Sequence, residues 1–221
     1  MNHPIGWNDV APLIDAVVRP HQLKYRVDLP EGRKGGWSVE RFTVPKPDKV
    51  SFEEFMLCLH YEAQGRSVPP GTYTRLMRSR NGSQQRDVIM SDTPAEITDH
   101  IEFLNMLPLL GGRVLVHGLG LGMAIKAALA VEGVTHIDVV EIDRDLIDLV
   151  GPHYEDERLT IHHGDALKFK WPTGSRWDLV WHDIWDSIDS DNIRDMKWLH
   201  RSFGHRCRWQ GSWARCYVDE N

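Results

Sequence analysis

Three glycines spaced two apart follow a short apolar run at residues 113–117, and an acidic residue ends the next apolar run. The glycines are Gly118, Gly120 and Gly122, and the acidic residue is Glu141. Glycine lets a strand turn sharply into a helix and lets the backbone approach a ligand that a Cβ would exclude. Glu141 is placed to accept hydrogen bonds from two ribose hydroxyls. The pattern therefore predicts a site for a nucleotide-type ligand.

The spacing of these glycines differs from the dinucleotide fingerprint. That fingerprint needs a third Gly or Ala three residues after the second glycine. Depending on which pair is counted, Met123 or Ile125 stands there. The G-x-G-x-G spacing therefore argues against a pyrophosphate ligand.

Acidic residues also follow the later apolar runs. They are Asp143 after Glu141, Asp165 beside Ala166, and Asp183 with Asp186. Two carboxylates three residues apart after a strand can face one cleft, and desolvation by nearby tryptophans would raise at least one pKa toward that of a general base. Capping of the following helix is an open alternative for Asp143, and for Asp186 or Asp189.

Strand-like runs alternate with helical patterns in the second part of the chain. The strands are expected at 113–117, 136–141, 158–162 and 178–183, with a fifth near 207–210, and the helices at 121–132, 143–150 and 190–203. A further helix follows the capping pattern at 92–96. The fold class predicted is α/β, a Rossmann-like doubly wound, mostly parallel sheet. Few residues remain after the last strand, so the sheet is expected to be shortened at its C-terminal edge or completed by the N-terminal segment.

The N-terminal part of the chain is punctuated by Pro and Gly and is expected to have little core of its own. Helices are predicted at about 8–18 and 51–65, and an Asn-Gly turn predicts a β-hairpin with strands at 72–77 and 86–90. We therefore expect two domains, an N-terminal extension at 1–90 and a Rossmann-like domain at 91–221.

Composition limits the function classes. No apolar run is long enough to span a membrane and no signal pattern stands at the start, so a cytoplasmic protein without a membrane partner is expected. Three scattered cysteines predict neither a disulfide framework nor a metal site. Residues 87–221 carry 13 Lys and Arg against 23 Asp and Glu. This acidic field argues against a nucleic-acid partner and for a small-molecule acceptor. A homodimer is possible.

Four successive motifs resemble those of class I S-adenosylmethionine-dependent methyltransferases, and are most similar to the spermidine synthase-like branch. They are Val-Leu-Val-His-Gly-Leu-Gly-Leu-Gly, Val-Val-Glu-Ile-Asp, His-Gly-Asp-Ala and Trp-Asp-Leu-Val-Trp-His-Asp, within about residues 87–190. The resemblance implies S-adenosylmethionine as cofactor, with the glycine loop against its methionine part, Glu141 on the ribose, Ile142 on the adenine, and Asp165 with Ala166 at the adenine amino edge. The cofactor-binding residues expected are His117, Gly118, Leu119, Gly120, Gly122, Glu141, Ile142, Asp143, Asp165, Ala166 and Asp183.

The same resemblance implies a transferase. We expect a methyltransferase in which Asp183 orients or deprotonates the acceptor, Asp186 assists and Trp185 lines the substrate pocket. Asp183 to Asp186 also resembles the D-x-x-D of aminopropyl transferases, which keeps transfer of an aminopropyl group from the decarboxylated cofactor open. The acidic residue usual in that family's glycine motif is absent, and His117 lies in that region. A non-catalytic module that keeps a cofactor-shaped pocket is the third alternative.

Overall fold

The computed structural model describes residues 5–6, 25–46, 49–50, 53, 68–79 and 85–215. The helix expected at 8–18 and nearly all of the one expected at 51–65 lie outside the described residues, as does the Asn-Gly turn.

A five-stranded parallel sheet confirms the predicted fold class. Its strands are β7 (Gly112–His117), β8 (Val134–Glu141), β9 (Leu159–His163), β10 (Trp177–His182) and β11 (Cys207–Ser212). Their order is β11-β10-β7-β8-β9, and every neighbouring pair is parallel. The chain order thus reverses between the neighbouring strands β7 and β10, and ligands of such sheets bind beyond the strand ends at this switch point.

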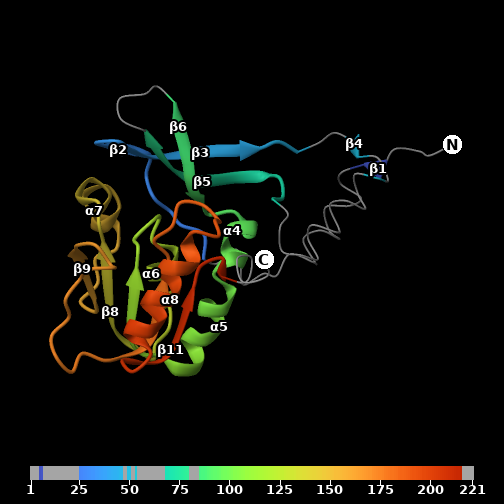
Figure 1. Ribbon diagram of the computed structural model, residues 1–221. Coiled ribbons are helices and arrows are strands. Elements are labelled where there is room, and N and C mark those ends of the chain that lie inside the picture. The colour runs from blue at the N-terminus through green and yellow to red at the C-terminus, as the bar shows by residue number, and fades with distance from the viewer. Residues whose placement is uncertain are drawn as a thin grey trace.

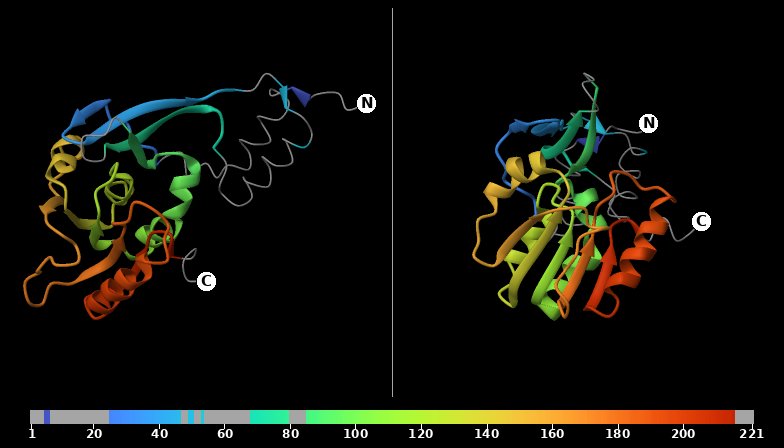
Figure 2. Two further views of the ribbon diagram at one scale, coloured as in Figure 1. Left: turned by 45° about the horizontal axis from the view of Figure 1, so that its top comes forward. Right: turned by 60° about the vertical axis from the view of Figure 1, so that its left-hand side comes forward.

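Helices cover both faces of this sheet (Figure 2). They are α4 (Pro94–Asp99), α5 (Ile101–Leu110), α6 (Met123–Leu129), α7 (Arg144–Val150) and α8 (Asn192–Phe203), with a 3₁₀ turn at Gly151–His153. Successive strand residues point to opposite faces. Val114 and Val116 pack with α5 and α6, whereas Leu115 packs in a second cluster with Leu199 and Phe203 of α8. The sheet is therefore doubly wound, as predicted.

The helix expected after residue 92 is in fact two helices. Thr93 caps the first, since its hydroxyl accepts from Glu96 N, and Pro94 occupies the first turn. At His100 the backbone leaves helical geometry, with φ −96° and ψ 4°, before α5 begins. The break aims the side chain of His100 into the protein interior, where it is 2% exposed.

An antiparallel sheet lies across the carboxyl ends of the parallel strands (Figure 1). It comprises β2 (Gly32–Lys34), β3 (Trp37–Val44), β5 (Gly71–Ser79) and β6 (Arg86–Ser91) in that spatial order. β5 and β6 form the predicted hairpin pair. A separate two-residue pairing joins β1 (Ile5–Gly6) to β4 (Lys49–Val50).

Described residues of the N-terminal part share the hydrophobic core of the parallel sheet. Val27, Leu29, Trp37 and Val39 are buried in the same hydrophobic cluster as the parallel sheet and its helices. Trp37 and Val39 are two residues apart on β3, so both point toward the parallel sheet. The division of the chain at residue 90 remains a prediction.

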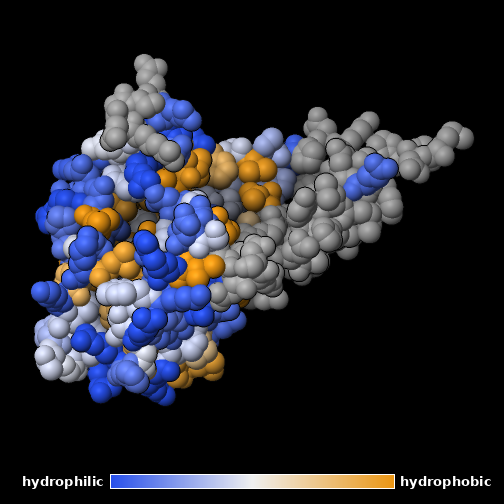
Figure 3. All heavy atoms as spheres, in the orientation of Figure 1, coloured by the Kyte–Doolittle hydropathy of each residue, from blue (hydrophilic) through white to orange (hydrophobic). Residues whose placement is uncertain are grey.

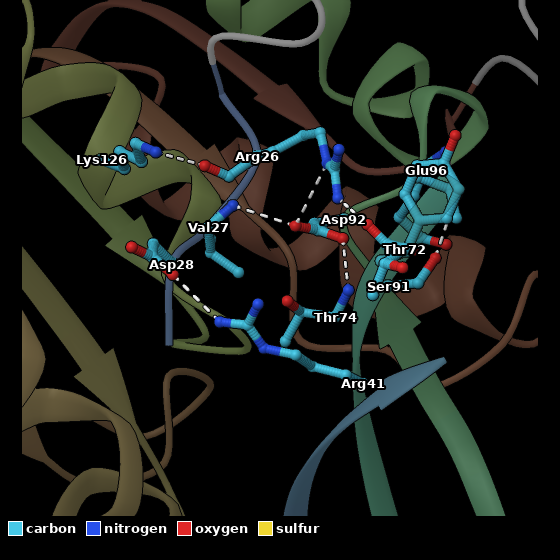
Figure 4. Close-up of polar contacts among 12 residues, drawn as sticks. Arg26, Val27, Asp28, Arg41, Thr72, Thr74, Ser91, Asp92, Glu96 and Lys126 are labelled. Carbon is cyan, nitrogen blue, oxygen red and sulfur yellow. Dashed lines mark hydrogen bonds and ion pairs between the residues drawn. The ribbon is translucent and has the colours of Figure 1, made fainter. Parts of the chain in front are cut away.

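Buried Asp92 joins the segment before β2 to strand β5 (Figure 4). Its carboxylate accepts hydrogen bonds from Val27 N at 3.1 Å and from Thr74 N at 2.7 Å, and it lies 3.7 Å from the Arg26 guanidinium. Lys126 of α6 donates to the carbonyl oxygen of Arg26. One carboxylate thus holds residues 26–27 and β5 at the start of α4.

Candidate functional site

A cavity of about 390 Å³ lies between the two sheets, at the carboxyl ends of the parallel strands. This volume is within the usual range of small-molecule sites, about 300–1,000 Å³. On the face in Figure 3, apolar residues form separate patches, several of them across the middle of the molecule, among hydrophilic residues. The walls come from the glycine turn, from β8 and the segments after β8, β9 and β10, and from the antiparallel sheet.

The glycine turn forms one wall because its backbone needs the absence of side chains. Gly118 has φ +95° and Gly120 has φ +51°, conformations that residues with a Cβ rarely adopt. A Cβ at Gly118 would lie 1.9 Å from the carbonyl oxygen of Asp183, and one at Gly120 would lie 2.3 Å from Met90 Sδ. Both glycines line the cavity. The tight turn predicted from the spacing is therefore present, packed against Asp183 and Met90, and close approach to a ligand stays a prediction.

Glu141 closes the turn from the neighbouring strand. Its Oε2 accepts from Leu119 N at 2.9 Å and its Oε1 accepts from Asp143 N at 2.8 Å. The residue is 6% exposed, and burial raises the pKa of the carboxyl, although the two backbone donors oppose that shift. Each carboxylate oxygen has a second lone pair. Glu141 lines the cavity, so it can hold the turn and still accept from a ligand hydroxyl.

The segments after β8 and β9 supply the next part of the wall. Ile142, 64% exposed, and Ala166 both line the cavity, as do Asp143 and Asp165. Asp143 also caps α7 through hydrogen bonds from Asp145 N and Leu146 N, so the capping alternative is correct for this residue. The ion pair of Asp165 with Lys168 lowers the pKa of Asp165. The structure brings all four together as expected, and their contacts with a cofactor remain predictions.

Asp183 lies at the junction of the glycine turn and the cavity. Its side chain is 21% exposed, and its backbone N donates to His117 O at 2.9 Å. Burial raises the pKa of its carboxyl to about 7, with smaller contributions from the negative charges of Asp99 and Glu141. A carboxyl with a pKa near the working pH is suited to general acid–base chemistry.

Asp186 lies in the same wall but has a cationic partner. It forms an ion pair with Arg78 of β5, whose guanidinium lies 5.3 Å from the ring centre of Trp37. The side chain of Asp186 is 45% exposed, and Asp191, not Asp186, occupies the position before α8. The helix-capping alternative for Asp186 is therefore wrong. Its assisting role stays a prediction, as does the substrate role of Trp185, which lines the cavity beside it.

His117 does not line the cavity, which corrects its expected place among the cofactor ligands. Its ring is fully buried on β7, and its Nδ1 lies 2.8 Å from Nδ1 of His182 on adjacent β10. Gln210 Nε2 donates to His200 O, so Gln210 Oε1 accepts from His182 Nε2. Neutral His182 must then accept at Nδ1, and His117 donates there. The two histidines therefore form a buried hydrogen bond between strands β7 and β10.

Leu119 and Gly122 lie behind the cavity wall. The side chain of Leu119 is buried in the core, and the residue serves the site through its N–H to Glu141. Gly122 begins α6, and a Cβ on it would lie 2.3 Å from the ring of Tyr154. Neither contributes a side chain to the cavity.

Several residues near the site were missed by the sequence analysis. Trp37, Arg78 and Met90 line the cavity from the antiparallel sheet, and Met90 Sδ accepts from Leu121 N at 3.1 Å. His100 Nε2 lies 3.8 Å from Asp183 Oδ2. The alternation of β3 could have shown that Trp37 points inward. The positions of the others depend on contacts between segments far apart in the chain.

Comparisons with known proteins relate parts of this chain to transferases. Ribosomal RNA small subunit methyltransferase A of Aromatoleum aromaticum is 53% identical over 66 residues, which cover 30% of this chain and 24% of that protein. The polyamine aminopropyltransferase of Agathobacter rectalis is 30% identical over 113 residues, 46% of this chain and 39% of that protein. No family model matches. The chain spans about a quarter to two fifths of the length of these relatives.

Solved structures with a similar fold are methyltransferases as well. An S-adenosylmethionine dependent methyltransferase from Mesorhizobium loti aligns with a TM-score of 0.34 and 20% identity, over 46% of this chain and 48% of that one. A dimethyladenosine transferase from Plasmodium falciparum aligns with a TM-score of 0.36 and 18% identity, over 46% and 36%. At these scores the likeness carries no functional argument. The comparisons agree with the expected transferase class and cofactor.

The expectation of a small-molecule acceptor with nucleic acid unlikely was wrong. Several of the curated relatives, including that of Aromatoleum aromaticum and another of Janthinobacterium, are named as ribosomal RNA methyltransferases. The error lay in averaging charge over half the chain, because net charge over a long segment does not report the field at one surface. Among the described residues no helix is long and apolar enough to cross a membrane, and no cluster of potential metal ligands occurs.

Proposed function

We propose that this chain is an S-adenosylmethionine-dependent methyltransferase with RNA as its acceptor class. The observation that carries the proposal is the meeting of the glycine turn, Glu141 and Asp183 around one cavity. Glu141 bonds to the turn through Leu119 N, and the backbone of Asp183 lies where a side chain on Gly118 would be. The ribosomal RNA methyltransferase relatives support the acceptor class.

The residues present fit the cofactor. Gly118 and Gly120 line the cavity with backbone alone, and the Glu141 carboxylate beside them offers acceptors for ribose hydroxyls. When bound, the cofactor would supply an electrophilic methyl group on a sulfonium. Because Asp183 has a pKa of about 7, it can accept a hydrogen bond or a proton from an amino group of the acceptor. Trp37 and Arg78 cover the cavity from the opposite side and limit the access of water.

One observation favours a second candidate, the transfer of an aminopropyl group. The polyamine aminopropyltransferase relative matches a longer part of this chain than the ribosomal RNA relatives do. The cavity is also lined by more carboxylates than cations, among them Glu96, Asp186 and Asp195. The spermidine synthase-like assignment therefore remains a proposal that the product mass can decide.

The test is transfer from S-adenosylmethionine to RNA, followed by mass spectrometry of the digested RNA. Methyl transfer adds about 14 Da to a nucleoside. In a parallel reaction with the decarboxylated cofactor and a polyamine in place of RNA, aminopropyl transfer would add about 57 Da to the polyamine, since each group is a different fragment of the same sulfonium. Asp183→Asn should abolish the product while retaining the fold. Absence of any RNA product with the wild-type chain, under conditions where S-adenosylhomocysteine binds, would exclude RNA as the acceptor.

A further inference from the structure

His100 lies behind Asp183, at the break between α4 and α5. It is 2% exposed, and its Nδ1 accepts a hydrogen bond from Trp181 Nε1 at 3.2 Å. Its other ring nitrogen, Nε2, is buried and has no hydrogen-bond partner among the described residues. That nitrogen lies 3.8 Å from Asp183 Oδ2. A polar atom of this kind is costly to bury without a role.

The chemistry of Trp181 fixes the protonation of this histidine. An indole N–H can only donate, so Nδ1 of His100 must be unprotonated and must accept. Burial lowers the pKa of His100 to about 4, so the ring is neutral at physiological pH. A neutral imidazole carries one proton, which must then be on Nε2. The free N–H of His100 therefore faces the carboxylate of Asp183.

The surroundings hold the histidine more firmly than the carboxylate. Trp181 stands two residues before Asp183 on β10, and Phe103 of α5 stacks on it with ring centres 5.5 Å apart. The ring of His100 lies against the same indole, at 5.8 Å. Asp183, in contrast, stands just past the end of β10 beside the cavity. Catalytic hydrogen bonds are often long without ligand and shorten in the complex. A small rotation of the Asp183 side chain would close the distance to Nε2.

We propose that His100 is a positioning residue for Asp183. The Nε2–H of His100 donates to one carboxylate oxygen of Asp183, and the other carboxylate oxygen is left directed at the acceptor. The role assigned to Asp183 rests on the proposed function, but the hydrogen bond itself does not. A neutral donor stabilises the ionised carboxylate without adding a positive charge next to a cationic cofactor.

The charges around Asp183 make such a donor useful. The charged groups that act on it or line its cavity are Asp99 and Glu96 from α4, Glu141 from β8, Asp143 and Asp165 from the segments after β8 and β9, Asp186 from the loop after β10, Asp195 from α8, and Arg78 from β5. Asp99 and Glu141 raise the pKa of Asp183, and Arg78 is paired with Asp186. The Nε2–H of His100 opposes the two carboxylates that act on Asp183 most directly.

The test is the pKa of the Asp183 carboxyl, measured by a pH titration with ¹³C NMR on the full chain labelled at aspartate. The Asp183 signal is assigned from its absence in Asp183→Asn. In His100→Leu, which removes the donor, the midpoint should rise by about one pH unit, a tenfold change in proton affinity. In His100→Gln, whose amide can accept from Trp181 and donate to Asp183, the midpoint should stay near that of wild type. A midpoint in His100→Leu that is unchanged or lower would overturn the proposal, as would an equal rise in both variants.

Trp181→Phe provides a second route if His100→Leu does not fold. It leaves the imidazole in place but frees Nδ1, so the ring can adopt the other tautomer, and the midpoint should rise by part of the same amount. An unchanged midpoint in Trp181→Phe would refute the tautomer argument. These readouts need no enzymatic turnover. Failure of methyl transfer or of S-adenosylhomocysteine binding would therefore count against the proposed function alone, and an unshifted carboxyl would count against His100 alone.

Discussion

Asp183 should make the folded chain less stable as the pH rises, and Asp183→Asn should remove that dependence. The folded pKa of about 7 lies above the usual 3.8, so the folded state holds a proton that the unfolded state releases. The sign follows directly. The destabilisation begins as the pH passes the unfolded value and is complete above the folded value.

The magnitude follows from these two pKa values. Linkage gives a cost of about 2 kcal/mol at pH 5 and about 4 kcal/mol at pH 8, because each pKa unit corresponds to about 1.4 kcal/mol. Relative to wild type, Asp183→Asn should therefore gain about 2 to 3 kcal/mol of unfolding free energy between pH 5 and pH 8. The neutral amide keeps the shape of the side chain but cannot ionise.

Urea denaturation at pH 5, 6, 7 and 8 and constant ionic strength measures this difference. Asp189→Asn is the matched control, since it makes the same substitution at an exposed position outside the cavity and should show no such trend. A constant difference between wild type and Asp183→Asn across this range would refute the buried, near-neutral carboxyl, and with it the assignment of Asp183 as a general base.

Three further predictions concern the turn, the histidine pair and the covering sheet. Gly118→Ala should lose S-adenosylhomocysteine binding and should lose more stability than the control Gly174→Ala. Both glycines have positive φ, but a Cβ at Gly174 meets nothing within 4 Å. The control should therefore lose about 1 kcal/mol of unfolding free energy in a denaturation experiment and keep binding. Burial lowers the pKa of His117 to about 3, so protonation of this residue in the unfolded chain should cost about 2 kcal/mol of stability as the pH falls from 7 to 5. By urea denaturation, His117→Leu should lose about 2 kcal/mol less than wild type over this range; buried His100 and His182, present in both, continue to contribute. Arg78→Met should change the unfolding free energy by less than about 1 kcal/mol, because the pair with Asp186 is partly exposed; a much larger loss would show that the pair holds the sheet in place.

Local sequence patterns predicted the strands and helices that alternate regularly along the second part of the chain. The runs that became β7, β8 and β10 were found nearly at their observed bounds, because buried parallel strands are short, largely apolar segments, and β9 was found from its place in the alternation of strands and helices. β2 and β3 were missed, since Gly and Pro around them favour turns, and their burial depends on packing against distant helices. The break at His100 was missed because the apolar spacing continues through it.

The residues of the candidate site likewise fall into those that local sequence patterns predicted and those that they did not. Gly118, Glu141 and Asp183 could be predicted, because each stands at the carboxyl end of a strand and such ends meet at one edge of a parallel sheet. His117 was misplaced because a strand end can point a side chain into the core as readily as into the cavity. Arg78 and Met90 reach the cavity only through the position of the second sheet, which no local pattern encodes.

The most direct test of the central claim is calorimetric titration of S-adenosylhomocysteine into the wild-type chain and into Glu141→Gln. The carboxylate of Glu141 is assigned to the ribose, and hydrogen bonds to a charged group are worth about 1.5 to 3 kcal/mol, so the variant should bind about 10- to 100-fold more weakly. Glu132→Gln, at an exposed position, should bind like wild type. No heat from the wild type at millimolar ligand, or equal affinity in wild type and Glu141→Gln, would contradict the account.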